Sequence, residues 1–87
     1  MSRYYFHSED GESVVDEEGT ELKDLAAAKD AAVAYLVDSL RHHPERLWDT
    51  ESFRITVQDE TRLTLFTIET SATYAAALGP SRRSASQ

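Results

Sequence analysis

The chain has 87 residues, of which 40% are hydrophobic and 29% are charged, and its formal net charge is −7. A chain of this length can bury one thin core, and its content of large apolar residues is that of a globular domain rather than a disordered one. It contains no cysteine, which excludes a disulfide framework, a thiolate metal site and a cysteine nucleophile. No apolar run reaches the length of a signal-peptide core or a membrane span, so we expect a cytoplasmic protein without membrane association.

The negative charge is concentrated near the N-terminus. Residues 1–24 contain eight acidic and two basic side chains, a local net charge of −6, which repels phosphate backbones. This distribution argues against nucleic-acid binding over the whole surface, although the later basic residues could form a local positive patch. The acidic residues are Glu9, Asp10, Glu12, Asp16, Glu17, Glu18, Glu21 and Asp24, and the later arginines are Arg41, Arg46, Arg54, Arg62, Arg82 and Arg83.

The N-terminal segment predicts a β-hairpin. Residues 3–7 are mostly aromatic and alternate as in a strand. Asp10 and Gly11 favour a tight turn, and residues 12–16 supply a returning strand. Residues 16–20 then break the pattern before a helix.

Residues 25–43 predict a long helix. They contain neither Gly nor Pro, and their apolar residues recur at helical spacing. Asp24 is the expected N-cap, because its carboxylate can accept a backbone N–H of the first turn. Pro44 is expected to end the helix. Ala28 and Ala32 lie on the apolar face, where small side chains allow the helix to approach a sheet closely.

Residues 53–58 and 63–69 predict a second hairpin around a polar turn at residues 59–62. In the last strand Leu63 and Leu65 fall on one face, whereas Phe66 and Ile68 fall on the other. Either a β-bulge intervenes or both faces are covered, for instance by a second subunit.

The remaining segments are predicted to connect or extend these elements. Residues 45–52 are expected to form a loop that folds Leu47 and Trp48 onto the core, and residues 73–78 a helical turn. We therefore predict an α+β fold of order ββαββ, with an antiparallel sheet of about four strands and one long helix packed on one face. Residues 1–78 form the single domain of this prediction, and residues 79–87 a flexible tail.

The sequence carries no motif for catalysis, cofactor binding or metal binding. The acidic run at residues 16–18, with Glu21, lacks the alternate ligand spacing of a calcium loop. His42 and His43 would point about 100° apart on a helix, which is poor geometry for joining His7 on one metal ion. A nucleophile elbow and a phosphate-binding glycine loop are both absent from the sequence. We therefore expect neither an enzyme nor a bound cofactor.

The aromatic residues allow alternative interpretations. Residues 4–6 are typical of sheet-based RNA binders if Arg3 or Arg54 shares their exposed face. Core packing is the more common role of aromatic residues on a short strand, and the surrounding carboxylates oppose an anionic ligand. Trp48 either closes one end of the core or is exposed as an anchor for a partner, since tryptophan is enriched at interface hot spots.

The N-terminal pattern resembles a family of small uncharacterised bacterial proteins that are frequent in alphaproteobacteria such as rhizobia. The resemblance covers residues 3–70, although family members often have proline where this chain has Lys23. The matching residues are Arg3-Tyr4-Tyr5-Phe6-His7, Asp10-Gly11, Asp16-Glu17-Glu18-Gly19-Thr20-Glu21-Leu22 and Asp24-Leu25, before an Ala-rich helix. The family is a domain of unknown function, so the resemblance implies one domain in a bacterial cytoplasm and supplies no substrate, cofactor or site residue.

These features predict a small, non-enzymatic protein-interaction or regulatory module that forms a homodimer or binds another protein. The expected contact residues are Trp48, Phe66 and Ile68. The alternative is an antitoxin-like regulatory protein linked to nucleic acid, in which Arg82 and Arg83 or the aromatic strand touch RNA or DNA. A small enzyme or a metal binder is the third alternative.

Overall fold

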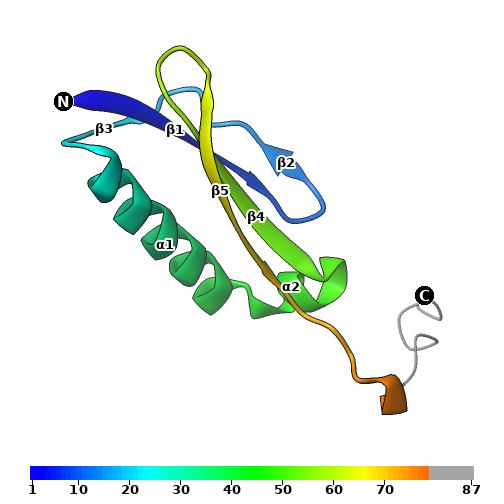
Figure 1. The fold of residues 1–87 in the computed structure, drawn as a ribbon. Coiled ribbons are helices and arrows are strands. Elements are labelled where there is room, and N and C mark those ends of the chain that lie inside the picture. The colour runs from blue at the N-terminus through cyan, green and yellow to red at the C-terminus, as the bar shows by residue number, and fades with distance from the viewer. Residues whose placement is uncertain (79–87) are drawn as a thin grey trace.

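The structure is a computed structural model that describes residues 1–78, and its fold is α+β (Figure 1). The predicted tail at residues 79–87 lies outside the described residues. In chain order the elements are β1 (Ser2–Glu9), β2 (Ser13–Val14), β3 (Thr20–Leu22), α1 (Leu25–His42), α2 (Pro44–Thr50), β4 (Ser52–Gln58), β5 (Thr64–Ser71) and the 3-10 turn η1 (Ala76–Leu78).

All five strands form one antiparallel sheet with β1 near its centre. On one side, β1 pairs with β3 through residues 2–4 and with β2 through Ser8 and Glu9, so β2 and β3 act as one interrupted outer strand. On the other side, β1 pairs with β4, and β4 pairs with β5. The resulting strand order is β2-β1-β4-β5, which makes β5 an edge strand (Figure 1).

The predicted order ββαββ is wrong in two places. The prediction has no strand at β3, which is only three residues long and carries no periodic pattern. It also treats residues 45–52 as a loop, whereas α2 fills most of this segment, so residues 1–78 contain two α-helices rather than one. Pro44 ends α1 as predicted, and it also begins α2, because its fixed φ and missing N–H suit the first turn of a helix.

The start and the inner face of α1 are confirmed. Asp24 caps the helix, and its Oδ1 accepts the Ala27 N–H at 2.9 Å. Ala28 and Ala32 have no exposed surface, as expected for a helix that lies close to a sheet. The small side chains therefore set the distance between α1 and the strands above it.

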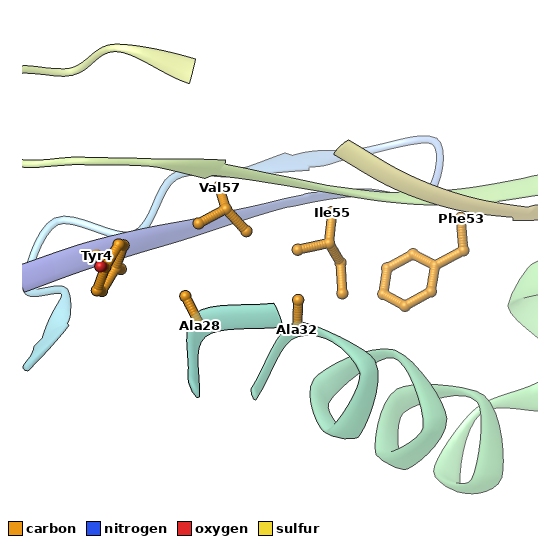
Figure 2. Close-up of a cluster of buried hydrophobic side chains, with 6 residues drawn as sticks. All are labelled: Tyr4, Ala28, Ala32, Phe53, Ile55 and Val57. Atoms are coloured by element: carbon orange, nitrogen blue, oxygen red, sulfur yellow. The ribbon is translucent and has the colours of Figure 1, made fainter. Parts of the chain in front are cut away.

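The core is a single layer between α1 and the sheet. Figure 2 shows the side chains of β1 and β4 pointing toward the two buried alanines of α1. The alternation predicted for residues 53–58 is confirmed, since every second residue of β4 is buried. The buried residues are Tyr4, Ala28, Ala32, Phe53, Ile55 and Val57.

A β-bulge explains the apolar pattern of the last strand. Gln58 pairs with Thr64 and Val57 pairs with Phe66, so Leu65 is an extra residue in β5. The bulge shifts the alternation and places Phe66 and Ile68 on the face that packs against the core. The sequence left open a bulge or cover on both faces of this strand, and the structure contains the bulge.

Candidate interaction surface

The outer side of β5 is the first candidate surface. Among residues 1–78, β5 pairs with β4 alone, in a register that ends with Ser52 opposite Ser71. Edge strands carry a row of backbone N–H and C=O groups that another chain can bind. β5 has eight residues and contains neither proline nor lysine, two of the residues that commonly prevent such pairing.

Alternate residues of β5 direct their backbone groups outward. Just beyond the paired segment, the Ala72 N–H donates to the Glu51 carbonyl at 3.1 Å, so the even-numbered residues of this segment face β4. Because backbone direction alternates along a strand, Thr67, Glu69 and Ser71 present their N–H and C=O groups to the outer side. A partner strand would bind these groups.

The opposite edge of the sheet is formed by the short strands β2 and β3, and a side chain closes the gap between them; we call this side the closed edge. The Phe6 N–H falls in the gap between β2 and β3, and Asp16 Oδ2 accepts it at 3.0 Å. Asp16 Oδ1 accepts the Glu18 and Gly19 N–H groups at 3.1 and 3.0 Å, which folds the connecting loop against β1. One carboxylate therefore takes the place of strand backbone at this edge.

The surroundings of Asp16 favour its ionised form. Burial raises the pKa of the Asp16 carboxyl, but its three backbone N–H donors lower it more, so the pKa lies below its ordinary value. The Asp16 N–H donates to His7 Nδ1 at 3.0 Å, which leaves His7 Nε2–H to donate to Gln58 Oε1 at 3.0 Å. The loop is thus joined to the face of the sheet away from α1.

That face of the sheet carries polar side chains that pair across the strands. The guanidinium of Arg54 lies 3.3 Å from one oxygen each of Glu9 and Glu69, so two carboxylates more than compensate its charge. This pairing argues against Arg54 as a phosphate contact. The other cross-strand contacts are Thr56 with Thr67, Gln58 with His7 and Thr64, and Arg62 over the ring of Tyr5.

Residues 4–6 do not form a shared aromatic platform. Tyr4 is 7% exposed and belongs to the core, and Phe6 packs against it. The Tyr5 ring lies on the other face, with the Arg62 guanidinium 4.3 Å from its centroid. The interpretation of Tyr4 and Phe6 as packing residues is therefore confirmed.

The predicted contact residues lie in two places. Phe66 and Ile68 are neighbours on β5, half-buried against the core, and sit directly beside the open backbone edge. Trp48 lies on α2, is 52% exposed, and contacts Tyr74 with the ring centroids 5.7 Å apart. The fold thus joins Phe66 with Ile68 but leaves Trp48 apart. Leu47, by contrast, packs against the core as predicted.

A second candidate surface lies between α1 and the N-terminal loops. Two neighbouring pockets of about 160 and 540 Å³ share Val14 and Tyr35 in their walls. Acidic side chains border both of them, including Asp10 in the smaller and Glu17 in the larger. The wall of the larger pocket contains Asp16, Glu17 and Glu18 and no basic side chain, so it would repel an anionic ligand. The wall of the smaller pocket also contains Arg46, which pairs with Asp10 at 3.2 Å.

The described residues contain no assembled metal site. Within residues 1–78, no three His, Asp or Glu side chains are close enough to hold a metal ion. His42 and His43 instead lie near single carboxylates, those of Asp38 and Glu45. No helix in this part of the chain is long and apolar enough to cross a membrane.

Sequence reasoning missed the outward backbone groups of Thr67 and Glu69. The alternation of β5 is readable from the sequence, but which strand lies at the edge depends on the order of strands in the sheet. The bulge at Leu65 also hides which residues share a face. One feature of the sequence could have indicated a strand open to pairing, the absence of proline and lysine from residues 64–71.

Comparison with known proteins agrees with the N-terminal resemblance at the level of the family. The model of a family described as Domain of unknown function (DUF6894) matches residues 3–71, which is most of the chain. No curated protein and no solved structure matches the chain. The matched residues run from the start of β1 to the end of β5, and thus include both edges of the sheet. The chain therefore belongs to the DUF6894 family.

Proposed function

We propose that the chain is a non-enzymatic protein-interaction module that binds a partner strand along β5. The observation that carries this proposal is the difference between the two edges of the sheet. One edge is formed by strands of only two and three residues with the Asp16 carboxylate between them, whereas the other, among residues 1–78, is the continuous eight-residue strand β5. Adding a strand to an exposed sheet edge is a common mode of protein recognition.

The side chains around β5 suit a protein partner. Phe66 and Ile68 are half-buried and lie next to the open backbone edge, so a partner strand would cover apolar surface as well as pair backbone groups. Backbone pairing would supply affinity, and the side chains beside it would supply specificity.

The nucleic-acid alternative has less support. Arg54 is held between two carboxylates and Arg62 lies over Tyr5, so neither guanidinium is presented alone on the sheet face. Arg82 and Arg83 lie outside the described residues. The resemblance of residues 3–70 to small alphaproteobacterial proteins supports a bacterial cytoplasm as the setting of the module.

Site-specific photo-cross-linking in cells tests the proposal. A photoreactive amino acid at Thr67 should give discrete protein adducts, because this residue lies at the middle of the open edge. The matched control places the same amino acid at Glu17, an exposed residue of the closed edge. Adducts that are equal at both positions, or absent from both, would contradict a β5 interaction surface.

A further inference from the structure

We propose that the partner is a second copy of this chain, and that the two β5 strands pair antiparallel about a two-fold axis at Thr67. This inference rests on the proposed function, because it names the occupant of the same edge. It would join the two sheets into one continuous sheet with the two α1 helices on the same face.

Symmetry restricts the register of such a pair. Two identical strands that pair antiparallel about a two-fold axis must place one residue opposite its own copy. If this residue directs its backbone outward, it exchanges two hydrogen bonds with its copy. Thr67, Glu69 and Ser71 meet this condition, and Thr67 is the most central of them in β5.

The side chains favour the register at Thr67. It places Phe66 opposite Ile68 of the second copy, on the face of the sheet that packs against the core. Aromatic and β-branched residues form favourable cross-strand pairs, and these two are half-buried in the single chain. A register centred on Glu69 would instead place two carboxylates directly opposite each other, which is unfavourable.

The charge distribution also fits a second copy. Five of the eight acidic residues of residues 1–24 lie on or next to β2 and β3, at the other side of the sheet from β5: Glu12, Asp16, Glu17, Glu18 and Glu21. Glu9 lies on β1, Asp10 pairs with Arg46 of α2, and Asp24 caps α1. Within β5 the single charge is that of Glu69, and Arg54 pairs with it at 3.3 Å. Two copies that meet along β5 would therefore bring edges of low charge together and keep the acidic segments around β2 and β3 far apart.

Single-cysteine variants of the full chain test the register, because the protein has no other thiol. At Thr67→Cys the two Cα atoms would be about 5.5 Å apart across a hydrogen-bonded pair, within the range that a disulfide spans. At Ser71→Cys, the matched control on the same outer side, the two residues would be about 27 Å apart. Fast disulfide formation by Thr67→Cys alone is the expected result.

Analytical ultracentrifugation of the unmodified chain tests the dimer itself. We expect a reversible dimer, and Thr67→Pro should weaken it roughly tenfold or more, since it removes the outward N–H and leaves the β4 ladder intact. Circular dichroism checks that Thr67→Pro is folded. A dimer that cross-links through Ser71→Cys as fast as through Thr67→Cys overturns the register.

A chain that stays monomeric at high concentration and forms no disulfide at Thr67→Cys overturns the homodimer. That result would not decide the proposed function. Photo-cross-linking at Thr67 in cells tests it independently, because it would detect a different protein partner on β5.

Discussion

Asp16 is the residue on which the closed edge of the sheet depends. Its carboxylate accepts three backbone N–H groups, and its pKa lies below the ordinary value despite partial burial. A carboxyl whose pKa is lower in the folded than in the unfolded chain stabilises the fold above the unfolded pKa of about 3.9. That contribution is lost as the pH falls through the lower, folded pKa.

Asp16→Asn should therefore destabilise the protein by about 1–3 kcal/mol at neutral pH, because an amide cannot replace both carboxylate oxygens as acceptors. The free energies of unfolding of the two proteins should converge as the pH is lowered below about 4. Urea titrations at several pH values measure this. Glu17→Gln is the control, and a constant gap between Asp16→Asn and the parent across the pH range would contradict the assignment.

A glycine is needed at position 19 for two reasons, the positive φ of its backbone and the lack of space for a Cβ. Its φ is 73°, and a Cβ at this position would lie 3.0 Å from the Tyr4 carbonyl oxygen and 2.8 Å from Arg3 Cγ. Gly19→Ala should cost at least about 1–2 kcal/mol from the left-handed backbone alone. Thermal unfolding measures the loss, and a variant as stable as the parent would show that the loop can adopt another conformation.

At the scale of elements, α1, β1, β4 and β5 were readable from the sequence because each has a periodic pattern or a clear boundary. Asp24 and the alanine face identified α1, and the alternation from Phe53 to Val57 identified β4. β3 was not readable, because three residues carry no period and its pairing with β1 depends on the folded loop. α2 was missed because Pro44 was interpreted only as a helix end.

Because α1 lies close to the sheet, a larger side chain on its inner face should destabilise the protein. Ala28→Leu adds a large side chain where no surface is exposed, and overpacking of this kind costs about 1–3 kcal/mol. Ala34→Leu is the matched control, since Ala34 is exposed on the same helix. Chemical denaturation should separate the two variants, and equal stabilities would contradict the tight contact shown in Figure 2.

Trp48 on α2 provides a spectroscopic test, because it is the only tryptophan in the chain. With 52% of its surface exposed, its fluorescence should be quenched readily by acrylamide and by iodide. Unfolding should then change its accessibility only moderately. A blue-shifted emission that resists both quenchers would mean that Trp48 closes the core instead.

At the scale of the whole molecule, charge is distributed unevenly across the sheet. Residues 1–24 carry most of the excess negative charge, and like charges at this density repel one another. Raising the ionic strength from about 0.01 to 0.15 M shortens the Debye length from about 30 to 8 Å and should stabilise the fold. Urea midpoints at several NaCl concentrations measure the effect. A fall in stability would mean that surface ion pairs such as Arg54 with Glu69 dominate.

The candidate surface was only half predictable at this scale. Phe66 and Ile68 were identified as contact residues because the last strand is apolar on both sides in the linear pattern. In the structure, the bulge at Leu65 turns both side chains toward the core. They still lie next to a candidate surface, because β5 is the edge strand of the sheet. Strand order arises from long-range pairing, which no local pattern in this chain encodes.

The loop around Asp16 also changes what the family resemblance means. The segment Asp16–Leu22, which is part of the resemblance seen in the sequence, contains the carboxylate that fills the gap beside β1, the glycine that fits against β1, and all of β3. Its contacts hold the loop and β3 against β1. A relative that lacks the aspartate must provide another acceptor for the Phe6 N–H, so differences in function between relatives should be sought in the residues of β5 instead.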